Sequence, residues 1–245
     1  MRRRTGTTQG TRASRPKSSR HTPNRIVRDG WNRLSELYRP PGANLDYFGH
    51  TGRQYREWLR PLIKQLKPGT AVLDLGCGSG EPASRGLAKH FAVTGVDVSD
   101  VMVRRARTAV PTGRFIRSDM TRVRFKEETF GAIVALYSII HVPLARQRPL
   151  FERIHSWLVP GGLLLAVVGH DAWEGTERGW LSSDVAMFWS HADAATYRRW
   201  LHEIGFIIVR QEFIPEGDSG HELFLARKRP SSDSARGRSG FARPG

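Results

Sequence analysis

Short apolar runs alternate with amphipathic stretches through the central part of this chain. Continuous apolar runs of strand length occur at residues 71–75, 92–96, 114–117, 132–136 and 163–168. Between them, apolar residues recur at helical spacing in residues 81–90, 100–109 and 149–158. Buried strands that alternate with helices are typical of a parallel sheet with helices on both faces, so we expect an α/β fold.

The pattern changes towards the end of the chain. Residues 196–204 favour a helix that ends at Gly205, because glycine readily adopts the left-handed conformation found just past a helix C-terminus. Two further strands, at residues 206–213 and 222–228, predict a closing hairpin. The expected architecture is one Rossmann-like domain, since 245 residues are too few for two full-sized domains once the tails are set aside.

Positive charge gathers at the two ends of the chain. The formal net charge is +16, but residues 1–28 hold nine Lys or Arg and no acid, and residues 227–245 hold six and one acid. The domain between them, at residues 29–226, is therefore nearly neutral. Both ends lack apolar periodicity, which predicts disordered tails after the last strand and before the domain. They serve either as solubilising ends or as a weak electrostatic anchor for RNA or anionic surfaces.

Other features of the composition narrow the class of protein. No segment approaches the roughly 18 uninterrupted apolar residues of a membrane span. Cys77 is the only cysteine, which excludes an intramolecular disulfide and agrees with a cytoplasmic location. The nine histidines show no paired ligand spacing, so we expect no metal site.

The segment VLDLGCGSG at residues 72–80 carries the strongest chemical signal. Its alternate glycines follow a buried strand and let the backbone approach a ligand closely at the start of a helix. Asp74 would repel a diphosphate and attract a ligand ammonium. Asp97 ends the next strand, where a carboxylate accepts hydrogen bonds from both hydroxyls of a ribose. Both acids also fit a simple capping role, but their joint spacing with the glycines favours a nucleoside site for a ligand that carries an amino group.

A third acid follows the third strand, in FIRSDMT. The carboxylate of Asp119 can accept from the exocyclic amine of adenine, and the backbone N–H of Met120 can donate to a ring nitrogen. Alternatively, Asp119 forms an Asx turn that leads into Thr121. Taken with the two earlier acids, the adenine interpretation is favoured.

These segments resemble a known family. VLDLGCGSGEPA, GVDVSDVMVRRAR, GRFIRSDMTRVRF, FGAIVALYSIIHVP and WLVPGGLLL, in this order, are similar to the motifs of class I S-adenosylmethionine-dependent methyltransferases. The resemblance covers about residues 29–228 and implies a seven-stranded sheet of order 3-2-1-4-5-7-6 with the seventh strand antiparallel. It also implies a set of residues that bind S-adenosyl-L-methionine: Tyr38, Asp74, Gly76, Gly78, Asp97, Val98, Asp119, Met120 and Tyr137. Tyr137 fits a packed core residue equally well.

Missing motifs exclude some kinds of methyl transfer. The fourth strand runs into ALYSII, without the Asn/Asp-Pro-Pro-aromatic motif that grips an exocyclic base amine, so adenine N6 methylation is disfavoured. Cytosine C5 methylation needs a thiolate nucleophile, yet Cys77 lies inside the glycine loop. The three clustered cysteines that would hold an iron–sulfur cluster are also missing, which excludes radical chemistry.

Two histidines are candidate general bases for the transfer. His141 follows the fourth strand, and His191 lies in a long insertion at residues 170–196. His141 fits a residue satisfied by the turn at Pro143 equally well. The insertion is rich in large side chains, which predict an aromatic lid over an apolar pocket or else a cover that merely packs on the sheet. They are Trp173, Trp180, Met187, Phe188 and Trp189.

The favoured function is methyl transfer from S-adenosyl-L-methionine to oxygen or nitrogen of a small organic molecule. One alternative is an RNA or protein methyltransferase recruited by the basic tails. Another is a non-catalytic module that keeps the cofactor site. The acceptor and the oligomeric state are not encoded in any motif of the chain.

Overall fold

The computed structural model describes residues 22–40 and 49–230, and most of the two expected tails lies outside these residues. The main sheet contains β1 (Ala71–Leu75), β2 (Ala92–Asp97), β3 (Arg114–Arg117), β4 (Phe130–Leu136), β5 (Leu158–Gly169), β8 (Phe206–Glu216) and β9 (Ser219–Lys228). The helices are α1 (Pro23–Tyr38), α2 (Gly52–Gln65), α3 (Ala83–Leu87), α4 (Asp100–Ala109), α5 (Leu144–Trp157) and α6 (Ala194–Ile204). A separate hairpin consists of β6 (Trp173–Arg178) and β7 (Ala186–His191), and the short helices η1 (Ile139–His141) and η2 (Trp180–Ser182) complete the set.

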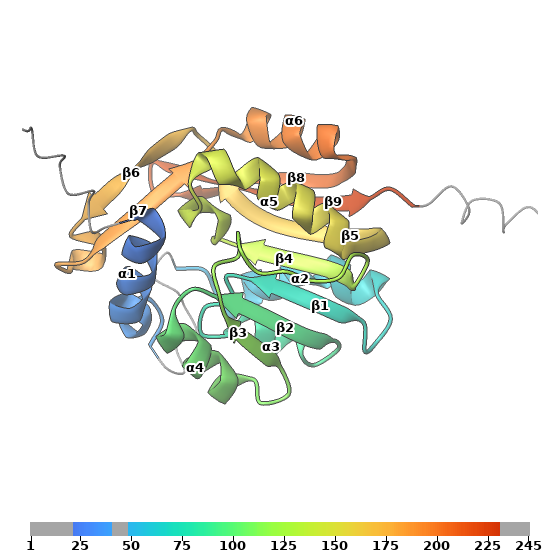
Figure 1. The fold of residues 1–245 in the computed structure, drawn as a ribbon, viewed down its shortest axis with the longest axis horizontal. Coiled ribbons are helices and arrows are strands. Elements are labelled where there is room, and N and C mark those ends of the chain that lie inside the picture. Colours follow the sequence, from blue (N-terminus) through green and yellow to red (C-terminus); the bar gives the residue numbers. More distant parts are fainter. Residues whose placement is uncertain (1–21, 41–48, 231–245) are drawn as a thin grey trace, which may run out of the picture.

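The seven strands of the main sheet lie in the order β3-β2-β1-β4-β5-β9-β8 (Figure 1). Neighbours from β3 to β5 pair in parallel, whereas β9 runs antiparallel to both β5 and β8. The expected Rossmann-like fold, its strand order and its antiparallel last strand are confirmed. None of the helices that the structure describes combines the length and apolar character needed to cross a bilayer.

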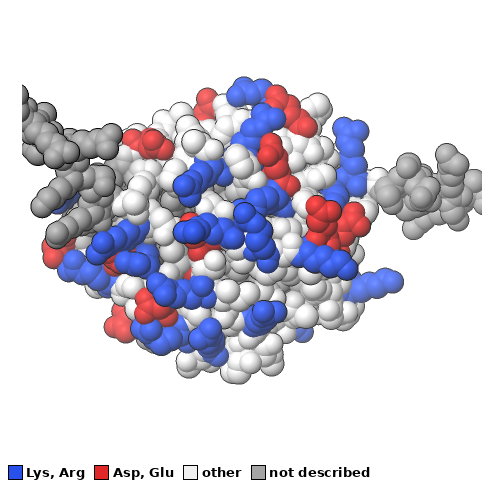
Figure 2. Space-filling view, viewed as in Figure 1, with Lys and Arg blue, Asp and Glu red and all other residues white. Residues whose placement is uncertain are grey.

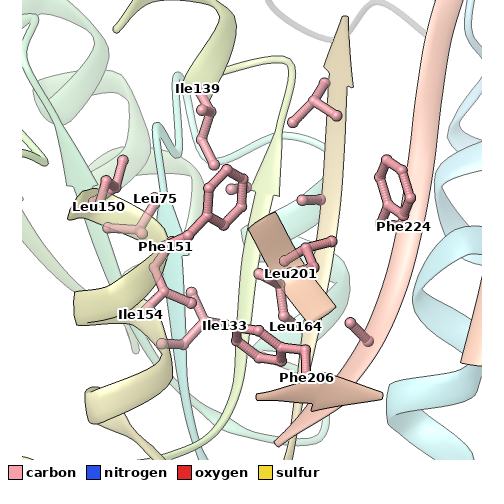
Figure 3. Close-up of a cluster of buried hydrophobic side chains, with 14 of the residues drawn as sticks. Leu75, Ile133, Ile139, Leu150, Phe151, Ile154, Leu164, Leu201, Phe206 and Phe224 are labelled. Atoms are coloured by element: carbon pink, nitrogen blue, oxygen red, sulfur yellow. The ribbon is translucent and has the colours of Figure 1, made fainter. Parts of the chain in front are cut away.

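Helices cover both faces of the sheet, and this explains the continuous apolar runs of its central strands. Side chains alternate along a strand, so Leu73 and Leu75 of β1 face one side and Val72 faces the other, all fully buried. Figure 3 shows the first side, where Phe151 and Ile154 of α5 pack toward the sheet together with residues of α6, β8 and β9. Helices α2 and α3 cover the second side. This double burial fixes where the strand ends lie.

Two helices differ from the expected ranges. Helix α3 is shorter than residues 81–90, because Pro82 precedes it at the N-cap and the chain turns after Leu87 into β2. Helix α5 begins at Leu144, ahead of the expected start at Pro149. A proline inside a helix removes a backbone hydrogen bond, and the burial of residues such as Leu150 on the sheet offsets that loss.

Helix α1 begins at Pro23, before the expected domain boundary at residue 29. Residues 23–28, assigned from their charge to a disordered tail, form its first turns. The apolar residues Val27 and Leu34 are buried on one side of this helix and pack with β7. Gly30 allows the close approach, since a Cβ there would lie 2.8 Å from Cε of Met187. The fold therefore extends further towards the N-terminus than expected.

The aromatic insertion forms the hairpin β6–β7, which stands beside α1 (Figure 1). Its base is fixed by the buried side chain of Gln147, whose Nε2 donates to the carbonyls of Ser190 (2.5 Å) and Val142 (2.7 Å). The hydroxyl of Tyr197 donates to Oε1 of the same glutamine at 2.6 Å. These buried bonds tie the hairpin to α5 and α6.

Candidate functional site

A cavity of about 920 Å³ lies at the carboxyl ends of β1, β2 and β4, and α1 covers it. In open parallel sheets, this edge is where ligands bind. Ten of the predicted site residues line the cavity: Tyr38, Asp74, Gly76, Gly78, Asp97, Val98, Asp119, Met120, Tyr137 and His141. His191 is not part of the cavity wall. Residues 41–48 fall outside the described residues.

The glycine loop packs tightly on one side and is open on the other. Gly76 has φ +76°, and a Cβ there would lie only 2.1 Å from Cβ of Ser138, so the close contact requires glycine. Its N–H donates to the carbonyl of Val96 at 2.7 Å, which ties the loop to β2. Gly78 has φ +53° and no atom within 4 Å of a Cβ. The backbone at Gly78 is thus bare towards open space, as a close-fitting ligand requires.

Asp74 is a buried acid, with 2% of its surface exposed. Its Oδ2 accepts a hydrogen bond from Oγ of Ser84 at 2.5 Å. Burial raises the pKa of Asp74 to about 7; the bond from Ser84 opposes this rise, and the charge of Asp97 adds to it. A ligand ammonium placed beside this carboxylate would favour its ionised form.

Asp97 closes the glycine loop onto the end of β2. Its Oδ2 accepts the N–H of Gly78 at 3.0 Å, and its Oδ1 accepts the N–H of Ser99 at 2.8 Å. Burial raises the pKa of Asp97 to about 6, although these backbone N–H groups favour the charged form. Each carboxylate oxygen has a further lone pair, so the side chain retains the capacity to bind ribose hydroxyls. The bond to Gly78 was not foreseen from the sequence.

Asp119 forms the Asx turn that was the alternative interpretation of its motif. Its Oδ1 accepts from both the N–H and the hydroxyl of Thr121, each at 2.8 Å. Among the described residues, Oδ2 takes part in no hydrogen bond, so the turn and a ligand contact are compatible. Met120 lies above the loop, since its Cε would be 3.4 Å from a Cβ on Gly76.

His141 is a buried, neutral imidazole in the cavity wall. Its Nδ1 lies 2.8 Å from the carbonyl of Phe188 and must carry the proton, because a carbonyl only accepts. Nε2 is then the site of the lone pair, and it is buried without a hydrogen-bond partner. Burial lowers the pKa of His141 to about 4, which keeps the ring neutral above that pH. Its Nε2 therefore carries a lone pair that no described residue uses.

His191 does not line the cavity, and neither do Trp173, Trp180, Met187, Phe188 and Trp189 of the expected aromatic lid. Its Nδ1 contacts the carbonyl of Asp171, and its ring faces Trp173 at 6.3 Å. The geometry thus brings His141, but not His191, together with the glycine loop.

The sequence analysis missed the part played by Trp31. This residue of α1 lines the cavity, and its ring meets those of Tyr38 (5.0 Å) and His141 (5.5 Å) edge to face. The signal was present: Val27, Trp31, Leu34 and Tyr38 recur at the spacing of one helix face. The basic character of the preceding residues obscured it.

Metal and thiol chemistry find no support in the residues that the structure describes. Within them, no group of three His, Cys, Asp or Glu side chains is arranged to hold a metal ion. Cys77 is buried, and burial raises the pKa of its thiol, which disfavours the reactive thiolate.

Comparisons with known proteins agree with this geometry. Residues 72–162 match a family described as a methyltransferase domain. The Bacillus subtilis protein YqeM, whose own assignment as a methyltransferase is provisional, is 25% identical over 179 residues, which cover 69% of this chain and 72% of YqeM. A 2-methyl-6-phytyl-1,4-hydroquinone methyltransferase of Synechocystis is 36% identical over 109 residues, which are 42% of this chain but only 33% of that enzyme.

A solved structure extends the match to the whole fold. Magnesium protoporphyrin IX methyltransferase from Synechocystis superposes with a TM-score of 0.66 at 18% identity, and the match covers 84% of this chain and 100% of that enzyme. At 18% identity, this comparison shows a shared fold. Combined with the matched domain, the glycine loop and the two buried acids at its edge, it supports a class I S-adenosylmethionine-dependent methyltransferase.

Proposed function

We propose that this enzyme transfers a methyl group from S-adenosylmethionine to an oxygen or nitrogen atom of a small organic acceptor. The proposal rests on one observation: two chemically different sets of residues line the same cavity. One wall consists of the glycine loop and buried carboxylates, and the other consists of aromatic rings and His141. A cavity of about 920 Å³ lies within the range of drug-sized binding sites, roughly 300 to 1,000 Å³.

The residues of the first wall suit the cofactor. Asp74 is a buried carboxylate whose pKa is raised by burial, and the cofactor's ammonium would relieve that cost. Asp97 would accept from the ribose, beside Val98. Asp119 and Met120 would frame the adenine. The remaining predicted contacts are the backbone of the glycine loop at Gly76 and Gly78 and the flanking rings of Tyr38 and Tyr137.

The second wall suits an acceptor with an apolar body and one proton to lose. Val27, Trp31 and Val142 provide apolar surface. The cofactor supplies a methyl group on a sulfonium sulfur, which needs an oriented nucleophile. The protein holds the acceptor's oxygen or nitrogen in line and excludes water, and Nε2 of His141 takes the proton.

The names of the relatives are consistent with a small acceptor. They include a hydroquinone, phosphoethanolamine and sterol methyltransferases, and the sterol enzymes are named for transfer to carbon. We favour oxygen or nitrogen for this chain because His141 lines the cavity and its Nε2 has no hydrogen-bond partner, so it would accept a proton from a hydroxyl or amine. A cytoplasmic location stays a prediction from the sequence.

Recruitment of RNA by a basic surface is the second candidate function, and the body of the protein gives it little support. On the face shown in Figure 2, Lys and Arg are interspersed with Asp and Glu. Several arginines of the described part of the chain are paired with acids, as Arg148 is with Glu203 and Glu152. The basic tails on which this candidate depends lie mostly outside the described residues.

The shared premise is tested by calorimetry with S-adenosylmethionine. We expect the Asp97→Ala variant to bind at least tenfold more weakly than the wild type, because the acid anchors both the loop and the ribose. Asp184→Ala, an exposed acid whose side chain is 79% accessible, is the matched control and should bind as the wild type does. Equal affinities for the wild type and Asp97→Ala would refute the proposed site. Methyl-labelled cofactor added to fractionated extracts then separates small-molecule, RNA and protein acceptors.

A further inference from the structure

A buried polar cluster lies behind the cavity wall and has no place in the function proposed above. Glu216, at the end of β8, accepts a hydrogen bond from the hydroxyl of Tyr137 at 2.7 Å. Nε2 of His50 lies 3.2 Å from the same oxygen, and Nδ1 of His221 lies 3.0 Å from the other. The side chains of His50 and Glu216 are 5% and 8% exposed. Of these four residues, only Tyr137 lines the cavity.

The cluster holds one stable negative charge. Burial by itself raises the pKa of Glu216, but hydrogen bonds from His221, His50 and Tyr137 outweigh it and lower the value to about 2. The carboxylate is therefore ionised at neutral pH. A hydroxyl that donates to a carboxylate forms a stronger bond than one that donates to a neutral acceptor, so Glu216 is a firm anchor for Tyr137.

Tyr137 has a backbone conformation that needs such an anchor. Its φ is +54°, in the left-handed region that bulky residues rarely adopt unless the surroundings impose it. The ring stacks on His50 at 5.2 Å and meets the edge of His221 at 5.0 Å. The same residues that surround Glu216 thus hold both the ring and the hydroxyl of Tyr137.

Ser138, the residue after Tyr137, contacts the glycine loop. Oγ of Ser138 donates to the carbonyl of Leu75 at 2.5 Å. Cβ of Ser138 also lies against Gly76, at the 2.1 Å separation from a hypothetical Cβ described above. A change in the backbone at Tyr137 would move Ser138, and with it the loop that is proposed to hold the cofactor.

We propose that Glu216 is a positioning residue for the cofactor site and acts through Tyr137, although it lies outside the cavity. The inference rests on the proposed function, because the loop matters only if it binds the cofactor. The chain of contacts runs from Glu216 to the hydroxyl of Tyr137, then through its backbone to Ser138 and Gly76.

The test measures binding of S-adenosylhomocysteine to the full chain by calorimetry. We expect Glu216→Gln to raise the dissociation constant about tenfold, which corresponds to about 1.4 kcal/mol. Glu222→Gln is a matched control. Glu222 is also a buried acid of the same hairpin, 5% exposed, and is bonded to His170 and Gln211 instead of Tyr137. We expect this control to bind within twofold of the wild type.

Two further measurements show whether the effect passes through Tyr137. Tyr137→Phe should weaken binding as Glu216→Gln does. The double variant should bind no more weakly than the single variant with the lower affinity, since both substitutions remove the same interaction. In the ligand-free protein, the backbone amide resonances of Gly76 and Ser138 should shift in Glu216→Gln and not in Glu222→Gln. This spectroscopic readout does not depend on binding.

The outcomes separate the two ideas. A folded wild-type chain that fails to bind S-adenosylhomocysteine refutes the proposed function and the inference with it. Wild type and Glu216→Gln that bind equally well refute the positioning role alone. Equal losses in Glu216→Gln and Glu222→Gln also overturn it, because they would indicate general destabilisation of the hairpin.

Discussion

Replacing Asp74 with asparagine is expected to stabilise the ligand-free protein while weakening its proposed hold on the cofactor. The carboxylate is almost fully buried, and the side chains described around it include the hydroxyl of Ser84 and the nearby acid Asp97, neither of which is a cation. Sites that bind charged ligands often carry such a cost in the empty state. An asparagine keeps the shape of the side chain and removes its charge.

The magnitude follows from the pKa of Asp74. Burial, partly offset by Ser84 and increased by Asp97, raises the pKa from 3.8 to about 7. Because one pKa unit is worth about 1.36 kcal/mol, the ionised carboxylate costs the folded state about 4 kcal/mol at most. The folded pKa is above the unfolded one, so this contribution favours folding below pH 3.8 and is lost as the pH rises through 7. The penalty is therefore greatest above pH 7.

Urea unfolding at pH 8 and pH 5 checks this reasoning. At pH 8 we expect Asp74→Asn to exceed the wild type in unfolding free energy by about 1 to 4 kcal/mol, the lower limit reflecting the buried amide that replaces the acid. At pH 5 the difference should fall by more than half. Asp184→Asn, on the surface, should match the wild type at both values. If Asp74→Asn is no more stable than the wild type at pH 8, the buried carboxylate carries no such cost and the reasoning fails.

Two other predictions concern the loop and the base. Gly76→Ala should lower the unfolding free energy, measured by urea unfolding, by about 2 to 4 kcal/mol, because the contact with Ser138 and the positive φ both oppose a side chain. Gly161 has φ +78° but faces open space, so Gly161→Ala should lower the unfolding free energy by only about 1 kcal/mol. Similar losses would contradict the packing argument. Once an acceptor is identified, His141→Gln should lower kcat by about a hundredfold and His191→Gln by less than threefold. The pH profile of the wild type should show no titration of His141 above pH 5, since its pKa is about 4. A loss confined to His191→Gln would reverse the assignment.

Much of the site could be predicted because the motifs follow strands of a parallel sheet. Asp74 and Asp97 lie at the carboxyl ends of neighbouring strands β1 and β2, which pair in register, so their positions along the chain fix their positions in space. Gly76 could be predicted for the same reason. Which of His141 and His191 lines the cavity could not be predicted, since it depends on how β7 packs against the rest of the fold.

The sequence by itself determined the alternating strands and helices, the glycine loop and the acids at its edge, because apolar periodicity and strand-end motifs are local properties of the chain. Tertiary structure alone decided that α1 packs on the β6–β7 hairpin and covers the cavity, and that Glu216 meets Tyr137. These contacts join residues far apart in the chain: 79 positions separate Tyr137 from Glu216, and 151 separate Arg33 of α1 from Asp184 of the hairpin. Periodicity reports that a residue is buried, but the partner it is buried against depends on how the layers pack, and so do the pKa values that burial sets.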